Sequence, residues 1–223
     1  WRWMRLVMGE KYLLVNAASF EVTLWENDRK LKTWPVIVGK AKSPTPIFEA
    51  TVSGVILNPW WEIPTSIVAE GIGSMVRNNP AAARRKGYVV QNGRYRQRPG
   101  PGNALGQMKL VMPNPYSVYL HDTPNKNLFS EAVRTFSHGC IRVGGAIDLD
   151  KTLLEGSATE EQIDNILASR KTTKLSLTKA IPIYIAYFTA EGAEDGTIRY
   201  FPDVYKRDRL KLAQNEPSTD CAA

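Results

Sequence analysis

Short runs of strand-forming residues, separated by turn residues, fill the first 120 positions and limit the fold more than any other feature. The runs cover residues 11–15, 20–25, 31–39, 51–59, 107–113 and 116–121. They are rich in aliphatic and aromatic residues, and Asn, Asp, Gly and Pro lie between them. Consecutive runs joined by short turns pair antiparallel. The sequence therefore predicts a mainly β (α+β) domain built on a mainly antiparallel sheet.

A long insertion, roughly residues 60–103, separates the fourth run from the fifth. Its first half has a helical pattern from a Thr65 or Ser66 cap to about Asn78, and its second half, 92–103, is basic and rich in turn residues. Segments of this length inside a compact domain are usually functional lids or disordered insertions. We predict that this insertion is a lid.

Helical patterns follow the strand-rich half of the chain. They cover residues 146–156 and 160–170, and Thr159 with Gln162 has the spacing of a capping box in front of the second helix. The strand-like segments predicted to close the domain as a hairpin are 181–190 and 197–201.

Size and composition fit one domain. The chain has 223 residues, 43% of them hydrophobic, which is enough for one sizeable core. We assign residues 1–210 to this domain and the polar residues 211–223 to a flexible tail. The sequence starts without Met and lacks the apolar core of a signal peptide, so we expect a fragment of a longer precursor. No run approaches the roughly 20 apolar residues that span a bilayer, so no transmembrane segment is predicted.

The positive charge of the chain is concentrated in the predicted lid. The formal net charge is +7, and residues 71–98 contain no acidic residue. The basic residues of this segment are Arg77, Arg84, Arg85, Lys86, Arg94, Arg96 and Arg98. Interleaved Arg and Tyr also permit nucleic-acid binding, which is the alternative function from outside the enzymes. No recognisable nucleic-acid-binding fold accompanies them, so nucleic acid is not the predicted partner.

Both histidines of the sequence, His121 and His138, lie close to Cys140. A thiol titrates at about 8.5, and either imidazole would help it react as a thiolate at neutral pH. Gly139 permits an amide-rich turn that presents N–H donors to an oxyanion. The rival site is zinc bound by His121, His138 and Cys140, with Asp122 as a fourth ligand. The residue types alone leave both hypotheses open.

The other cysteine, Cys221, lies in the tail, and two cysteines are too few for a disulfide framework.

The segment from Tyr119 to Val143 resembles the active-site signature of L,D-transpeptidases of the YkuD type. In that signature a His precedes a Ser/Thr-His-Gly-Cys run at a spacing like the fifteen residues that separate His121 from Ser137. The resemblance is to the larger periplasmic members from Gram-negative bacteria and covers nearly the whole chain. Further segments that share it are 36–48, 58–64, 99–106 and 176–190.

The resemblance implies an L,D-transpeptidase-like β-sandwich, with the insertion as lid and C-terminal helices, that transfers acyl groups on peptidoglycan. By this resemblance Cys140 is the nucleophile, which attacks the bond between the diamino acid and D-Ala of a tetrapeptide donor stem. His121 accepts and donates the proton, and Ser137, His138 and Gly139 shape the loop and its oxyanion hole. The resulting thioester passes to an acceptor amine and cross-links the cell wall. Neither a metal nor another cofactor is implied.

Three polar side chains near the signature have further expected roles. Arg142 shares the strand parity of Cys140 and is predicted to bind a substrate carboxylate, with a structural ion pair as the alternative. Tyr119 shares the parity of His121 and is predicted to line the groove, with a place in the core as the alternative. Asp122 should point away from His121, because adjacent strand residues face opposite sides, so a structural role in the following turn is expected.

The expected partners are the donor and acceptor stem peptides of peptidoglycan, and carbapenem inhibitors. The resemblance places the protein in the Gram-negative periplasm. Hydrolysis of the same thioester by water would instead make the enzyme an L,D-carboxypeptidase, which is the alternative enzyme activity.

Overall fold

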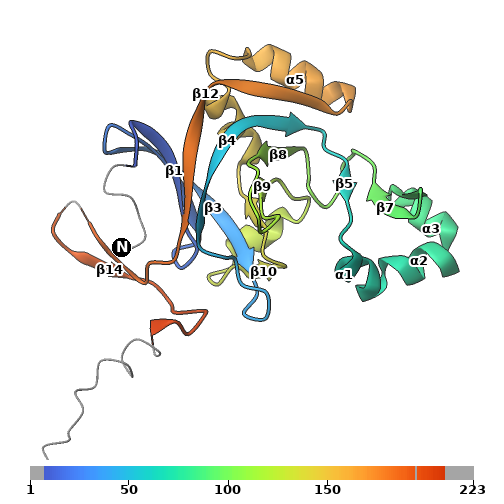
Figure 1. The fold of residues 1–223 in the computed structure, drawn as a ribbon, viewed down its shortest axis with the longest axis horizontal. Coiled ribbons are helices and arrows are strands. Elements are labelled where there is room, and N and C mark those ends of the chain that lie inside the picture. Colours follow the sequence, from blue (N-terminus) through green and yellow to red (C-terminus); the bar gives the residue numbers. More distant parts are fainter. Residues whose placement is uncertain (1–7, 194, 209–223) are drawn as a thin grey trace, which may run out of the picture.

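A computed structural model describes residues 8–193 and 195–208 of the chain (Figure 1). The predicted tail at 211–223, with Cys221, lies outside the described residues. The strands of the main sheet are β1 (Lys11–Asn16), β2 (Glu21–Glu26), β3 (Arg29–Gly39), β4 (Phe48–Leu57), β8 (Met108–Val111), β9 (Leu120–His121), β10 (Thr135–Ser137), β11 (Ile141–Val143) and β12 (Thr173–Ala186). The prediction of a mainly β domain is confirmed.

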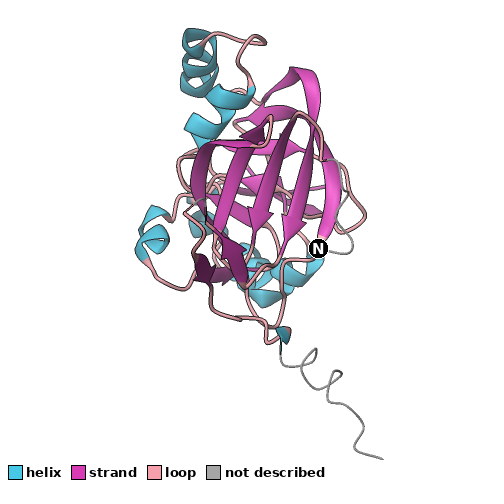
Figure 2. Cartoon of the chain, turned by 90° about the vertical axis from the view of Figure 1, so that its left-hand side faces the viewer, coloured by secondary structure: helices cyan, strands magenta, loops and turns pink. Residues whose placement is uncertain are grey.

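The main sheet closes on itself. Its strand order is β10-β3-β11-β9-β8-β4-β12-β1-β2, and β2 also pairs with β3. Figure 2 shows these strands with the helices at the borders of the sheet. Most neighbours are antiparallel, as predicted, but β1–β12, β3–β10 and β9–β11 are parallel. The two layers of the predicted sandwich are therefore continuous parts of one sheet.

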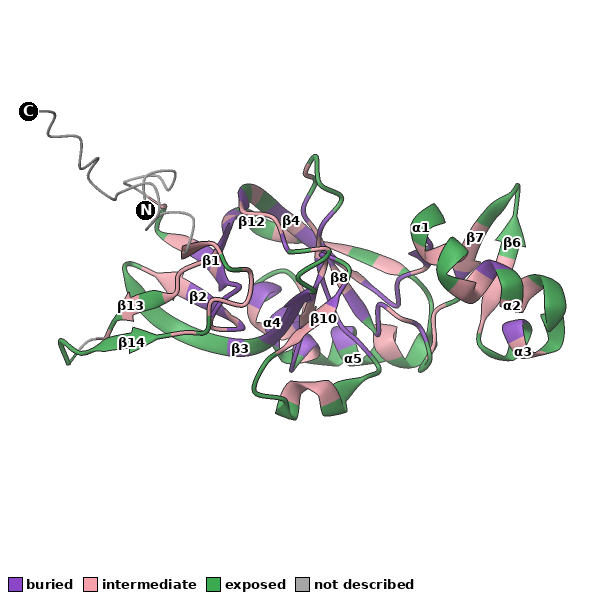
Figure 3. Ribbon diagram, turned by 90° about the horizontal axis from the view of Figure 1, so that it is seen from below, coloured by how far each residue is buried: buried purple, intermediate pink, exposed green. Residues whose placement is uncertain are grey.

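A single hydrophobic core lies inside this closed sheet. Leu13 of β1, Val36 of β3, Leu110 of β8 and Ile183 of β12 are fully buried and belong to one cluster. Each buried side chain of this size contributes about 1.5–3 kcal/mol to folding. Figure 3 shows the buried residues concentrated in the central strands, whereas the surfaces of the insertion are largely exposed. The core therefore fixes the strands on which the signature residues lie.

The helices after the signature are α4 (Ala146–Leu153) and α5 (Glu160–Ser169). The capping box is confirmed, because the Thr159 hydroxyl accepts from the Gln162 N–H while the Gln162 side chain accepts from the Thr159 N–H. The first helix ends earlier than the predicted position 156. On the described residues, no helix is both long and apolar enough to cross a membrane.

The insertion is a folded unit with its own small core. Its helices are α1 (Thr65–Ile67), η1 (Val68–Ile72), α2 (Gly73–Asn78) and α3 (Pro80–Arg85), and its strands are β5 (Trp61–Glu62), β6 (Tyr88–Gln91) and β7 (Arg94–Gln97). Trp61, Ile63 and Leu105 are buried together in it. It projects from one side of the main sheet (Figure 1).

Two expectations for the insertion were wrong. No side chain caps α1, which begins directly after Pro64, and the helical stretch kinks at Gly71, where φ is 145°. Residues 92–97, expected in a turn-rich loop, are part of the β6–β7 hairpin. Its turn is Asn92–Gly93, with φ of 50° and 74°, a dipeptide that favours two-residue hairpin turns.

The run predicted at 116–121 forms a strand only at Leu120–His121. The Asn114 side chain binds the carbonyls of Met112 and Val118 and accepts from the N–H of Tyr116. These bonds give the backbone partners that a strand neighbour would otherwise supply.

The predicted closing hairpin is also different. Residues up to Ala186 belong to β12, which pairs antiparallel with β4 and parallel with β1. Only β13 (Ala190–Gly192) and β14 (Ile198–Tyr200) form a hairpin. Burial of Ile183 and Ile185 between β4 and β1 outweighs local pairing.

Asp150 of α4 is a buried acid, with an exposed fraction of 0% and no hydrogen-bond partner for either oxygen among the described residues. Burial, together with Asp122, raises the pKa of this carboxyl well above 3.8. The folded state therefore holds a proton that the unfolded state releases, and the stability associated with it is lost as pH rises above about 4.

We expect Asp150→Asn to gain stability relative to the parent chain as pH rises from about 5 to about 8, by about 1–3 kcal/mol in total. Urea unfolding at several pH values measures the difference. Asp148→Asn is the control: Lys32 lowers the pKa of Asp148, so its effect should be flat over this pH range. A flat difference for Asp150→Asn would contradict the prediction.

Candidate active site

Three neighbouring strands place Lys109, His121 and Arg142 in one row. Lys109 of β8 is paired with His121 of β9, and His121 is paired with Arg142 of β11. Directly paired residues point to the same face of a sheet. Cys140 is two residues before Arg142, and the Ile141 N–H binds the Tyr119 carbonyl at 3.0 Å, so Cys140 lies beside Tyr119. The structure therefore brings Tyr119, His121, Cys140 and Arg142 together as the sequence predicted.

His121 is buried and held by a backbone carbonyl. Its Nδ1 lies 2.5 Å from the Asp122 carbonyl oxygen, and because a carbonyl only accepts, Nδ1 carries the proton. Burial lowers the pKa of His121 to about 3, with the positive charges of Arg142 and Lys109 acting in the same direction. The backbone carbonyls of Asp122 and Leu105 act in the opposite direction on this pKa. At neutral pH the ring is therefore uncharged, and Nε2 carries the lone pair.

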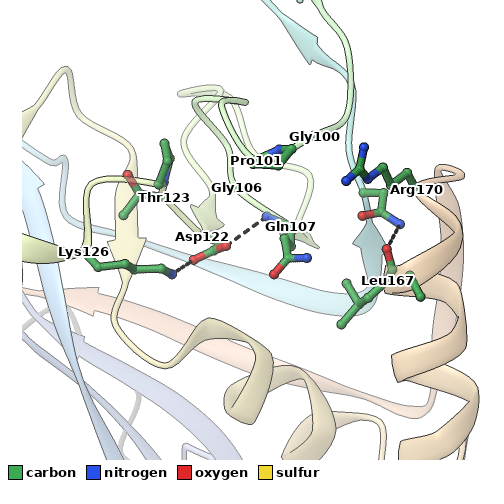
Figure 4. Close-up of a pocket in the computed structure, with 12 residues that line it drawn as sticks. Gly100, Pro101, Gly106, Gln107, Asp122, Thr123, Lys126, Leu167 and Arg170 are labelled. Carbon is green, nitrogen blue, oxygen red and sulfur yellow. Dashed lines mark hydrogen bonds and ion pairs between the residues drawn. The ribbon is translucent and has the colours of Figure 1, made fainter.

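The Asp122 side chain points away from this group, as predicted. It accepts from the Gln107 N–H at 2.9 Å and from the Lys126 ammonium (Figure 4). It lines a separate cavity of about 470 Å³ with Gly106 and Arg170. Asp122 is therefore not the third member of a triad. The expected role in the following turn belongs instead to Thr123, whose hydroxyl accepts from the Asn125 N–H.

The loop that carries Cys140 is organised by Ser137. The buried Ser137 hydroxyl donates to the Cys140 carbonyl at 2.5 Å and accepts from the Gly139 N–H at 3.1 Å. Gly139 has φ of 115°, which favours glycine. The Gly139 N–H suggested as an oxyanion donor is thus engaged by Ser137.

A second support for this loop was missed in the sequence. Thr45 Oγ1 donates to the Gly139 carbonyl and accepts from the Gly39 N–H, both at 2.9 Å. Tyr205 in turn donates to the Gly39 carbonyl at 2.8 Å. Thr45 and Tyr205 are distant from Cys140 in sequence, so no local pattern connects them to it. The signal that the sequence offered for Thr45 was its place between Pro44 and Pro46, in a segment that resembles the family.

Cys140 is partly exposed, and its Sγ lies 3.8 Å from the Ser117 carbonyl. Burial raises the pKa of this thiol, whereas Tyr119, Lys109 and Arg142 lower it. Tyr119 is half-buried, and its ring contacts His121 edge-on, with 5.6 Å between the centroids. Burial and the proximity of Cys140 raise the pKa of Tyr119, so its hydroxyl stays protonated beside the sulfur.

Arg142 and Lys109 are cations without a carboxylate partner in the described part of the chain. The Nε of Arg142 is buried and, among these residues, has no hydrogen-bond partner. The structural ion pair considered for Arg142 is therefore not formed. Lys109 was missed by the sequence analysis, although a lysine inside an otherwise apolar strand was a signal.

His138 links the loop to the insertion. Its Nε2 lies 3.1 Å from Oε2 of Glu70 in η1, and both side chains are well exposed. His138 thus points toward the insertion, because Gly139 turns the chain and breaks the extended geometry that would align His138 with Cys140. This exposed ion pair joins the insertion to the signature loop, and the role of the insertion as a lid stays a prediction.

The four ligands of the zinc hypothesis do not converge. Asp122 faces Gln107 and Lys126, and His138 faces Glu70. Over residues 8–193 and 195–208, no group of three His, Cys, Asp or Glu side chains could hold a metal ion.

Comparison with protein families gives a match over residues 10–160 to YkuD, the L,D-transpeptidase catalytic domain. A Haemophilus influenzae protein provisionally named an L,D-transpeptidase is 31% identical over an alignment of 224 residues. The alignment covers 91% of this chain and 46% of that protein. The chain thus spans about half the length of the curated relative it matches.

Comparison with solved structures also gives matches, at low sequence identity. An L,D-transpeptidase from Mycobacterium smegmatis matches with a TM-score of 0.40 and 16% identity, covering 79% of this chain and 58% of that chain. L,D-transpeptidase 3 from Mycobacterium tuberculosis, in complex with a faropenem-derived adduct, matches with a TM-score of 0.40 and 11% identity, covering 79% and 60%.

Proposed function

Because the chain belongs to the family of YkuD-type L,D-transpeptidase catalytic domains, we propose that it is a peptidoglycan L,D-transpeptidase that acts in the Gram-negative periplasm. The observation that carries this proposal is that Cys140 lies next to Tyr119 and two residues before Arg142, which pairs with a neutral His121 whose Nδ1 proton is bound by a backbone carbonyl. A nucleophile beside an oriented base is the minimum needed for acyl transfer.

The first half of the reaction forms a thioester. Cys140 Sγ attacks the carbonyl carbon between the diamino acid and the terminal D-Ala of a tetrapeptide stem, and its proton passes to Nε2 of His121. The C–N bond then breaks, and His121 returns the proton to the amine of the leaving D-Ala. In the second half an acceptor amine attacks the thioester and His121 takes its proton, and the C–S bond then breaks as His121 returns that proton to Cys140 Sγ.

Substrate binding is proposed for the groups around the sulfur. Arg142, whose Nε has no hydrogen-bond partner among the described residues, is proposed to bind a stem carboxylate, and Tyr119, next to Cys140, is proposed to line the substrate groove. The lid contributes exposed positive charge from Arg77, Arg84 and Arg85, which attracts the carboxylates of the stems. Arg96 differs, because it is paired with Glu62 at 2.6 Å.

The products formed from purified tetrapeptide muropeptides test the proposal. We expect mass spectrometry to show loss of D-Ala together with a cross-linked dimer, and neither with Cys140→Ala. Tripeptide without dimer would assign the alternative L,D-carboxypeptidase activity, in which water resolves the same thioester. Unchanged tetrapeptide with a folded protein would contradict both activities.

A further inference from the structure

Two half-buried cations flank His121 in the strand row. Lys109 lies on one side and Arg142 on the other. The Lys109 ammonium is 3.7 Å from the centroid of the Tyr119 ring, and Tyr119 neighbours Cys140. The two positive charges of Lys109 and Arg142 therefore lie near the Cys140 sulfur.

Over residues 8–193 and 195–208, neither cation forms an ion pair with a carboxylate. The acid that acts on Lys109 is Glu62, which is already paired with Arg96, and Arg96 lies over the Trp60 ring. Burial lowers the pKa of both Lys109 and Arg142, and the negative charge of an ionised Cys140 raises it. The thiolate of Cys140 therefore stabilises the charged forms of Lys109 and Arg142, and these two cations stabilise the thiolate in return.

His121 does not supply this positive charge. In many cysteine enzymes a protonated histidine stabilises the thiolate. Here burial lowers the pKa of His121 to about 3, and Arg142 and Lys109 oppose its protonation. The other histidine, His138, faces Glu70 on the insertion.

We propose that Lys109, together with Arg142, stabilises the Cys140 thiolate, and that His121 serves as a neutral proton acceptor. This inference rests on the proposed acyl transfer and adds a residue to it. As the sulfur attacks, the thiol proton moves to Nε2 of His121. Lys109 keeps its protons throughout and balances the negative charge that develops on Sγ.

The pKa of the thiol tests this proposal without any peptidoglycan. It is obtained from the pH dependence of iodoacetamide alkylation, in a Cys221→Ser background so that one thiol reacts. Besides Lys109 and Arg142, the titratable group that acts on Cys140 is Tyr119. Arg142, Tyr119 and His121 all stay unchanged in the Lys109 variants.

We expect Lys109→Met and Lys109→Gln to raise the thiol pKa by about one pH unit or more, since one nearby opposite charge typically shifts a pKa by about 1–3 units. Lys109→Arg keeps the charge and should restore most of the effect. The matched control is Lys179→Met, which removes a lysine whose side chain is 83% exposed and should change nothing. His121→Asn should also leave the thiol pKa nearly unchanged.

A thiol pKa that rises in His121→Asn and not in the Lys109 variants would overturn the proposal in favour of a thiolate–imidazolium pair. An equal rise in Lys179→Met would show a nonspecific charge effect and also overturn it. If the Lys109 variants have an unchanged thiol pKa and still cross-link muropeptides, the inference fails and the proposed function stands. If the thiol pKa rises as expected but the parent protein leaves muropeptides intact, the inference stands and the proposed function fails.

Discussion

His121→Ala should reduce the rate of thioester formation on Cys140 by about 100-fold or more, because no other group in the row can take the thiol proton at neutral pH. Lys109 and Arg142 are cations, and Tyr119 stays protonated. Quenched reactions with tetrapeptide muropeptides, read by intact mass, measure the rate. Circular dichroism checks that the variant is folded.

His138→Ala is the informative comparison for this prediction. Its side chain contacts Glu70 of the insertion, whereas Ser137 and Thr45 hold the loop. We expect measurable turnover, within about tenfold of the parent protein, and a similar value for Glu70→Ala, which breaks the same contact. Complete loss of activity in both histidine variants would leave the proton acceptor unassigned. Loss of activity only in His138→Ala would make His138, and not His121, the proton acceptor.

A carbapenem should form one long-lived adduct per chain, and that adduct should lie on Cys140. The strained lactam carbonyl imitates the scissile amide, so the attack uses the same thiol and the same proton acceptor. Cys221 is an internal control, because the neighbouring Asp220 disfavours its thiolate and acyl transfer needs more than a reactive thiol.

Intact mass and peptide mapping locate the adduct. It should persist in Cys221→Ser and be absent in Cys140→Ser. An adduct that follows Cys221, or none on a folded protein, would mean that residues 136–145 are not an acyl-transfer loop.

The strands and one helix start could be predicted because their signals are local. Residues 11–16 and 48–57 alternate or run apolar over the length of a strand. The Thr159–Gln162 capping box acts within one turn of helix, and it forms as expected. The hairpin at Asn92–Gly93 had an equally local signal, but the basic character of the segment favoured a loop.

The errors lie where distant partners decide the structure. Residues 181–186 have a strand pattern that fits a local hairpin equally well, and the choice of β4 and β1 as neighbours depends on burial in the shared core. At 116–119 the Asn114 side chain binds the backbone, so that β9 begins only at Leu120.

The sequence by itself determined the chemical types at the site: a Cys with two His close by, a Ser and Gly before it, and an Arg that shares the strand parity of the Cys. It also indicated that Asp122 points away from His121, because residue alternation along a strand is a local property.

Only the tertiary structure decided what surrounds these groups. The register of β8, β9 and β11 puts Lys109 beside His121, and the closed sheet brings Thr45 and Tyr205 under the Cys140 loop. Burial, which the closed sheet creates, keeps His121 neutral. The physical reason is that strand register and burial arise from contacts between segments far apart in the chain, which no local pattern records.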